Sequence, residues 1–232
     1  MSAALRVEAL GKRFGDLVAL ENVSFELAPG ELLGIMGPNG AGKTTLLAAI
    51  AGVQAPSSGT VSLPPREVGW APQQAALYGK LTVAENLALF ARLERVPDAR
   101  AAVAAMLEQT GLSERAGDQL ARLSGGNRQR VNVAAGLLGD PPVLALDEPS
   151  ASLDPAQRER LWTFVKGLTA TGRAVVFSTH NPAEAQRHAD RLLVLDAGRL
   201  RFDGTTAELL ARAGAGETDL EHALVRFLEA VA

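Results

Sequence analysis

The chain has 232 residues, of which 47% are hydrophobic, enough for one large domain or two modest lobes with a real core. Its formal net charge of −3 and the lack of a basic stripe argue against nucleic acid as a main partner, and the absence of cysteine excludes disulfides and thiolate metal sites. The N-terminus lacks the apolar core of a signal peptide, and no apolar run approaches the ~18 to 20 residues of a membrane span.

The first thirty residues alternate between apolar and polar side chains, which predicts short strands that end at the turn Pro29-Gly30. An apolar run at 32–36 then predicts a buried strand, and helical periodicity follows over 45–51. Between them, residues 37–44 read G-P-N-G-A-G-K-T and match G-x-x-x-x-G-K-[ST], the pattern of a phosphate-binding loop.

A strand, a glycine loop and a helix start together form a cradle for phosphate. Glycines let backbone N–H groups converge on an anion, the helix start adds partial positive charge, and Lys43 adds a full one. The hydroxyl of Thr44 can be placed on Mg²⁺. The predicted phosphate-binding residues are Gly37, Pro38, Asn39, Gly40, Ala41, Gly42, Lys43, Thr44 and Thr45.

A polar turn at 54–59 precedes a predicted strand at 60–63, and a further short strand at 68–70 ends at Pro72-Gln73. The composition then changes between about 81 and 140, where Ala- and Leu-rich helical periodicity dominates. Thr82 followed by Glu85 predicts a capping box at the start of the first of these helices. We expect a helical lobe that is inserted into an α/β core.

Strand character returns at 143–146 and at 174–177, and residues 192–195 and 200–202 flank a turn and predict a hairpin. The alternation of strands and helices indicates a mostly parallel sheet with antiparallel strands added. The strand at 143–146 ends in Asp147 and Glu148. A carboxylate beside the phosphate loop can hold Mg²⁺ through its waters, and the next one can orient or deprotonate an attacking water.

Residues 123–130, L-S-G-G-N-R-Q-R, resemble the signature motif of the ATP-binding cassette (ABC) ATPases, with Asn127 in place of the more frequent Gln. The resemblance extends from residue 5 to about 210 through six ordered motifs. It implies an α/β P-loop NTPase fold: a mostly parallel sheet, an antiparallel β subdomain and an inserted helical lobe. The implied ABC ATPase domain is 1–212, with a core at about 1–73 and 141–212 and a helical lobe at about 74–140; residues 213–232 are a linker and a short C-terminal helix.

The resemblance also implies roles for single residues. Phe14 matches the aromatic residue that stacks on adenine, although a packed strand aromatic is the alternative. Gln73 matches the glutamine that contacts Mg²⁺ and the attacking water. Gln74 is adjacent, but the proline before Gln73 favours Gln73 for this match. The alternative is that Gln73 is a solvated loop residue. Asp147 matches the metal-side carboxylate, and Glu148 matches the catalytic one.

Two further positions follow from the same resemblance. Asp154 matches the aspartate that communicates across the dimer, and the alternative is a helix cap before Pro155. The family often has Gly where this chain has Ser152. His180 matches the histidine that senses the γ-phosphate, and the alternative is a structural histidine at a strand end.

Ser124, Gly125 and Gly126 should begin a helix that continues to residue 137, and a helix start is an anion site. On a separate lobe it cannot reach its own phosphate loop. The family solution is a head-to-tail dimer, in which each signature meets the γ-phosphate bound by the other subunit. The second subunit is either an identical or a different chain.

We therefore expect an ATPase that binds ATP and Mg²⁺ and drives a separately encoded transmembrane permease from the cytoplasmic face of the membrane. Leu77 and Tyr78 lie where the family receives a coupling helix, but this pair is equally compatible with the lobe core. Leu77-Tyr78, the segment 81–87 and the tail 219–224 resemble drug- and lipid-type export ATPases. The segment between Gly59 and Gln73 is shorter than usual in them and similar in length to that of some metal importers, so an importer is the alternative. Weaker alternatives are a non-transport ABC protein and a P-loop kinase or GTPase.

Overall fold

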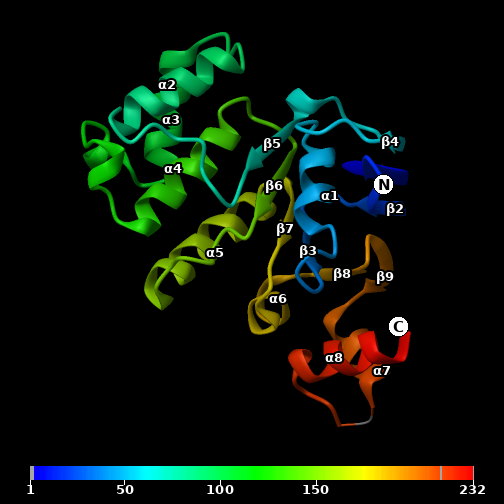
Figure 1. Ribbon diagram of the computed structural model, residues 1–232. Helices are drawn as coiled ribbons and strands as arrows, with labels where there is room; N and C mark the ends of the chain where they lie inside the picture. The colour runs from blue at the N-terminus through cyan, green and yellow to red at the C-terminus, as the bar shows by residue number, and fades with distance from the viewer. Residues whose placement is uncertain (1–2, 215, 232) are drawn as a thin grey trace.

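Six strands form the central sheet of this computed structural model, which describes residues 3–214 and 216–231 (Figure 1). Residues 1, 2 and 232 of the predicted domains and residue 215 of the predicted linker lie outside the described residues. The strand order is β5-β6-β7-β3-β8-β9, with all neighbours parallel except the β8–β9 hairpin. The strands are β3 (Leu32–Met36), β5 (Val68–Ala71), β6 (Val143–Asp147), β7 (Ala174–Ser178), β8 (Arg191–Asp196) and β9 (Arg199–Gly204).

Every residue of β3, β6 and β7 is buried, which explains why these strands read as unbroken apolar runs rather than alternating ones. The three strands are adjacent in the order β6-β7-β3. Because they are parallel, their carboxyl ends meet at one edge of the sheet, where the loops after all three strands come together.

A second sheet is antiparallel, with strands β1 (Leu5–Phe14), β2 (Leu17–Leu27) and β4 (Ser58–Val61) in the order β2-β1-β4. The several short strands that we predicted here are two long ones. Ala9 and Asn22 have left-handed backbone, and the β1–β2 register shifts between Val7 and Leu10. Such bulges interrupt the alternation of side chains without ending the strands, which is why the sequence pattern looked broken.

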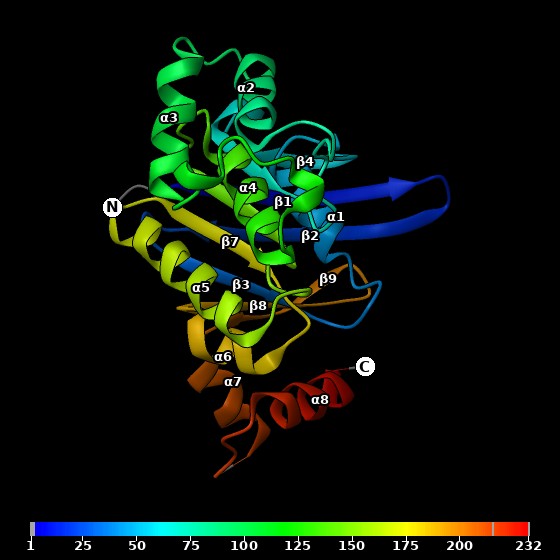
Figure 2. The same ribbon diagram turned by 90° about the vertical axis from the view of Figure 1, so that its left-hand side faces the viewer.

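Helices cover both faces of the central sheet (Figure 2). On one face, α1 (Lys43–Ile50) buries Leu46, Leu47 and Ile50 between the central sheet and the antiparallel one. On the other face lie α5 (Pro155–Ala170) and α6 (Pro182–His188). Trp162 of α5 is fully buried and packs edge-on against Phe177 of β7. The phosphate-loop helix is therefore held between two sheets.

A helical lobe stands beside the sheet and has its own apolar core, which includes Leu87, Leu107 and Val131 (Figure 1). Its helices are α2 (Val83–Leu93), α3 (Ala99–Gln109) and α4 (Gly125–Leu137), with 3₁₀ turns η2 (Ser113–Arg115) and η3 (Leu120–Arg122); a further turn, η1 (Pro65–Glu67), precedes β5. The capping box is confirmed, because Thr82 and Glu85 each accept the other's backbone N–H. The domain boundaries at 73 and 140 stay a prediction.

The last two helices, α7 (Thr206–Ala213) and α8 (Leu220–Val231), pack on the β8–β9 side of the core. Leu220 and Phe227 of α8 join Met36 and Phe202 in one buried cluster. The C-terminal helix is thus attached to the strand that leads into the phosphate loop. Among the described residues, no helix is both long and apolar enough to cross a membrane.

Candidate functional site

The loop between β3 and α1 has a backbone that only glycine adopts easily. Gly37, Gly40 and Gly42 have φ values of +146°, +82° and +101°. A Cβ on Gly37 would lie 2.0 Å from the carbonyl oxygen of Leu195, and one on Gly42 would lie 2.7 Å from that of Ala19. A side chain at these positions would push the loop off the neighbouring strands, so the glycines are needed both for conformation and for space. Helix α1 begins at Lys43, two residues before the predicted start.

Lys43 folds back over this loop. Its Nζ donates to the carbonyl oxygens of Gly37, at 2.7 Å, and Pro38, at 3.1 Å. Burial lowers the pKa of Lys43, while the negative charges of Glu148 and Asp147 act in the opposite direction. The ammonium group therefore lies inside the loop, held by carbonyl groups that a bound phosphate can replace as partners.

Asp147, at the end of β6, is joined to both neighbouring loops. Its Oδ1 accepts from the hydroxyl of Thr44, at 3.2 Å, and from that of Ser178, at 2.6 Å. Carboxylate and hydroxyl oxygens suit Mg²⁺, which usually takes one or two protein ligands together with phosphate oxygens and water. Among the described residues no group of three or more His, Cys, Asp or Glu side chains is placed to hold a metal.

Glu148 and His180 form the closest pair of titratable side chains in the site. Glu148 Oε2 lies 2.6 Å from His180 Nδ1, and the carboxylate is 11% exposed while the imidazole is 63% exposed. Glu148 has left-handed backbone, with φ +47°, and its N–H donates to Ser178 Oγ at 2.9 Å. The ends of β6 and β7 thus aim an acid–base pair at the space in front of the phosphate loop.

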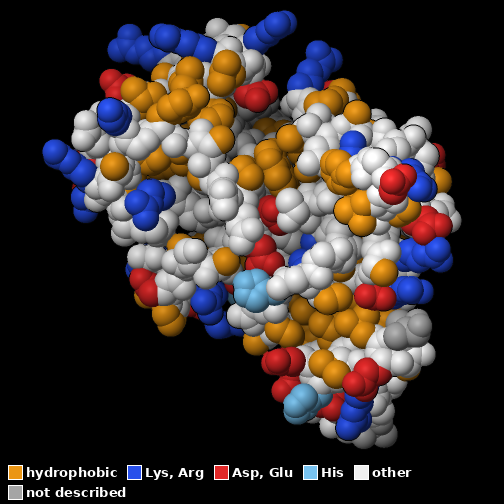
Figure 3. Space-filling view, viewed as in Figure 1, with side chains coloured by type: hydrophobic (Ala, Val, Ile, Leu, Met, Phe, Trp, Pro, Cys, Tyr) orange, Lys and Arg blue, Asp and Glu red, His pale blue; other side chains and the backbone are white. Residues whose placement is uncertain are grey.

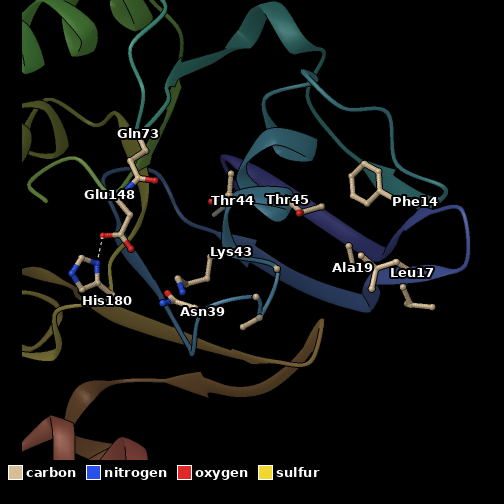
Figure 4. Close-up of a pocket in the computed structure, with 14 residues that line it drawn as sticks. Phe14, Leu17, Ala19, Asn39, Lys43, Thr44, Thr45, Gln73, Glu148 and His180 are labelled. Carbon is tan, nitrogen blue, oxygen red and sulfur yellow. Dashed lines mark hydrogen bonds and ion pairs between the residues drawn. The ribbon is translucent and has the colours of Figure 1, made fainter.

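Lys43, Thr44, Glu148 and His180 line one cavity of about 600 Å³ (Figure 4). Phe14, Leu17 and Ala19 lie at one end, and Gln73, Glu148 and His180 lie at the other, with Lys43 between them. The full lining is Phe14, Leu17, Val18, Ala19, Asn39, Gly40, Ala41, Gly42, Lys43, Thr44, Thr45, Gln73, Glu148 and His180. In Figure 3 a histidine lies beside acidic side chains where this face is hollowed. The apolar end suits a base and the cationic middle suits phosphate groups, while the acid–base end lies where the last phosphate would be. The cavity therefore suits a nucleoside triphosphate.

Two features of the site were missed by the sequence reasoning. Leu17, Val18 and Ala19 begin β2 directly after the turn that follows Phe14. The sequence signal for these three residues was their position just across a hairpin turn from Phe14, which is expected to stack on adenine. Only the folded hairpin shows that they line the cavity. Ser178 was also missed; the signal was a polar residue at the end of a buried strand.

Seven predicted site residues do not line this cavity. Three of them, Gly37, Pro38 and Asp147, accept hydrogen bonds from Lys43 or Thr44, which do line it. The other four belong to the starts of α4 and α5. They are Ser124, Gly125, Gly126 and Asp154. Ser124 caps α4 by accepting from the N–H of Asn127 at 3.4 Å, and Asp154 caps α5 by accepting from the N–H of Gln157 at 2.8 Å. A Cβ on Gly126 would lie 2.6 Å from the Gln157 side chain, so the two helix starts lie together. The signature thus has the helix start that the sequence predicted, away from its own phosphate loop.

Comparison with known proteins places these motifs in a family. The sequence profile described as "ABC transporter" matches residues 20–151. Nod factor export ATP-binding protein I of Cupriavidus metallidurans is 39% identical over 223 residues, which cover 90% of this chain and 74% of that protein. The linearmycin resistance ATP-binding protein LnrL of Bacillus subtilis is 34% identical over 230 residues, with 94% and 74% covered.

Solved structures agree with these sequence matches. An ATP-binding subunit of an ABC transporter superposes with a TM-score of 0.85 at 28% identity, covering 98% of this chain and all of that one. A dimeric ATP-binding cassette in a post-hydrolysis state, bound to ADP and Pi, gives a TM-score of 0.76 at 28% identity, covering 87% of this chain and 98% of that one.

Proposed function

This chain belongs to the ABC transporter family of ATP-binding proteins, and from that premise we propose that it hydrolyses Mg-ATP at composite sites of a head-to-tail dimer and powers an exporter. The observation that carries the proposal is the single cavity that joins an apolar end, the buried Lys43 and the Glu148–His180 pair. We place the base against Phe14, Leu17 and Ala19 and the phosphates in the loop at Lys43. The γ-phosphate then faces Glu148 and His180.

In this arrangement Glu148 orients an attacking water and accepts its proton, since its carboxylate faces the cavity from a fixed backbone. His180 contacts that carboxylate through Nδ1 and lines the same cavity, where we place the γ-phosphate. Thr44, Asp147 and Gln73 are the residues that would hold Mg²⁺, which neutralises charge on the phosphate oxygens when bound. Thr44 and Asp147 already share a hydrogen bond, so the two oxygens are preset close together.

The second half of each composite site would come from the signature of another subunit. Ser124, Gly125 and Gly126 present the N-terminus of the 13-residue helix α4 outside the chain's own cavity. A helix start favours an anion, and a second copy facing the first can bring it to the γ-phosphate. We place Asp154, which starts the adjacent helix, at the same dimer interface.

A separate transmembrane partner would dock between the lobe and the core. A cavity of about 570 Å³ opens there, and its lining includes Val53, Trp70 and Phe90. Tyr78 is 57% exposed nearby in sequence, whereas Leu77 packs on the lobe core, so of that pair Tyr78 is the residue that is free to contact a partner. The names of two relatives, a Nod factor export ATP-binding protein and a linearmycin resistance ATP-binding protein, support export. We place this chain at the cytoplasmic face of the membrane.

Co-purification tests the partner and the direction of transport. A tagged Glu148→Gln chain is expressed in its own cells, and the proteins that co-purify are identified by mass spectrometry. A multi-spanning partner without a binding protein is the expected result. An extracytoplasmic binding protein in the complex would instead indicate import, and a soluble partner alone would overturn the transport function.

Metal dependence tests the proposed Mg²⁺ site. We expect chelation by EDTA to stop ATP hydrolysis, and added Mg²⁺ to restore it, because Thr44 and Asp147 offer oxygen ligands but no compensating positive charge. Undiminished hydrolysis in EDTA would remove the metal from the proposal.

A further inference from the structure

Glu184 is a buried carboxylate that the proposed function leaves unexplained. It lies in α6 and is 4% exposed, and it forms no ion pair with Lys, Arg or His in the described part of the chain. Burying a carboxylate without a cation is costly unless its oxygens are fully hydrogen-bonded. An apolar residue would pack at lower cost, so a specific use of the acceptors is the better explanation.

Three neutral donors from three different elements satisfy the carboxylate. Ser150 Oγ and Trp162 Nε1 donate to Oε1, the latter at 2.8 Å, and Thr179 Oγ1 donates to Oε2 at 2.7 Å. All three donor residues are buried. The network is therefore shielded from water, and each donor has a defined place.

Two of these donors belong to the loops that carry the acid–base pair. Ser150 is two residues beyond Glu148, and Thr179 directly precedes His180. Glu184 thus bridges the loop after β6 and the end of β7 from behind, while Glu148 and His180 face the cavity in front. Glu184 itself does not line that cavity.

The third donor ties this bridge to the core. The Trp162 ring is fully buried, packs edge-on against Phe177, and stacks on His188 with centroids 4.7 Å apart. A ring held on two sides gives its N–H a fixed direction. Glu184 is consequently anchored to α5 through Trp162 while it accepts hydrogen bonds from both loops.

We propose that Glu184 is a positioning residue, which sets the separation of Glu148 and His180 by holding Ser150 and Thr179. This inference rests on the proposed roles of Glu148 and His180 in ATP hydrolysis. Glu148 has left-handed backbone that a non-glycine residue keeps only when its surroundings enforce it. Its own N–H bond to Ser178 provides one restraint, and the Ser150–Glu184 bond two residues later provides the second.

The first test compares Glu184→Ala with Glu184→Gln in steady-state ATP hydrolysis by the full chain. The amide oxygen of glutamine can accept from Ser150 and Trp162, and its NH₂ can donate to the Thr179 hydroxyl, so the bridge is retained. We expect kcat of Glu184→Ala to fall about 10- to 100-fold with KM within about twofold of wild type, and Glu184→Gln to stay within about threefold in kcat.

The second test removes one donor at a time and stays informative even when Glu184→Ala fails to fold. Thr179→Val loses the donor on the catalytic loop, and Trp162→Phe loses the donor on α5 while keeping an aromatic ring. We expect Thr179→Val to lower kcat by about tenfold or more, and Trp162→Phe to lower the melting temperature without a matching fall in kcat.

Two results would overturn the positioning role. One is full kcat in both Glu184→Ala and Thr179→Val, and the other is a loss of kcat that follows the melting temperature across all four variants. The wild-type chain and Glu148→Gln in the same assay distinguish a failure of the proposed function from a failure of the positioning role. If wild type lacks Glu148-dependent hydrolysis, the proposed function fails; if it has that activity and Glu184→Ala retains it, only this inference fails.

Discussion

At the scale of single residues, the positive charge of the site and its proposed proton-transfer groups belong to different side chains. Lys43 is buried inside a loop of carbonyl groups, whereas Glu148 and His180 face the cavity from two strand ends. The lysine can neutralise phosphate without taking part in proton transfer, and the acid–base pair lies on the opposite side of the expected γ-phosphate. Each role is thus set by where the backbone places the side chain.

Among the residues that line the cavity in the described structure, Lys43 alone carries a lysine or arginine charge. We expect Lys43→Ala to abolish ATP turnover, because no other such cation is placed to compensate for the phosphates. Steady-state phosphate release measures this. Lys166→Ala, a change to an exposed lysine of α5, is the matched control and should retain activity. Turnover by Lys43→Ala would refute the assignment of the cradle.

Phe14 is 46% exposed at the apolar end of the cavity, with Lys12 Nζ 5.0 Å from its ring centroid. Stacking of a base on an aromatic ring contributes about 1–3 kcal/mol. We expect Phe14→Ala to raise the Kd for ATP about 5- to 100-fold and Phe14→Tyr to leave it nearly unchanged, as measured by titration calorimetry.

Inorganic triphosphate is the matched control ligand, because it lacks the base. Its affinity should be the same for Phe14→Ala and wild type. An unchanged Kd for ATP in Phe14→Ala would mean that the ring serves packing alone.

At the scale of elements, helix starts are used in two ways. The start of α1 lies in the cavity and is left without a side-chain cap, since Gly42 is its N-cap. The starts of α2 and α7 are instead closed by capping boxes, at Thr82 with Glu85 and at Thr205 with Glu208. A capping box stabilises the helix that it begins, whereas the uncapped start of α1 leaves its N–H groups free to bind an anion.

The capping box of α2 gives a stability prediction. Thr82→Ala should lower the free energy of unfolding by about 1 kcal/mol, because the N–H of Glu85 in the first turn of α2 then loses its side-chain acceptor. Urea denaturation measures the change, and ATP affinity should be unaffected because Thr82 does not line the nucleotide cavity. Thr163→Ala removes an exposed mid-helix hydroxyl and is the control, expected to change little. Equal stability of the two variants would contradict a capping role.

At the scale of the whole molecule, the two halves of the proposed site lie in parts of the chain that the described structure does not bring together. The phosphate loop belongs to the sheet, while the signature helix starts beside α5 and outside the cavity. A solved dimeric cassette of similar fold was bound to ADP and Pi after hydrolysis. Two copies arranged head to tail would give two complete sites, so nucleotide and dimer are expected to stabilise each other.

This coupling predicts the behaviour of Glu148→Gln. Because it should bind ATP without hydrolysing it, we expect a stable ATP-bound dimer, with the mass by light scattering rising from 24.2 kDa to twice that value at saturating Mg-ATP. Adding Ser124→Arg to the same variant should block dimer formation while ATP still binds. A monomeric Glu148→Gln chain under these conditions would sink the dimer mechanism.

What the sequence determined by itself is local. The phosphate loop, the Asp147-Glu148 strand end, the capping box at Thr82 and the Ser124 helix start are short patterns. Their backbone and chemistry depend on neighbouring residues, and the structure has each of them. The order of the motifs along the chain was also enough to identify the family, and therefore the fold class, because few folds use these motifs in this order.

Only the tertiary structure decided which of these pieces meet. The pairing of β6 with β7 brings His180 within 2.6 Å of Glu148. Tertiary packing also placed Leu17 to Ala19 in the cavity and Glu184 behind the Glu148–His180 pair. The reason is physical: strand pairing and burial join residues far apart in the chain, and local periodicity carries no information about which buried strands become neighbours.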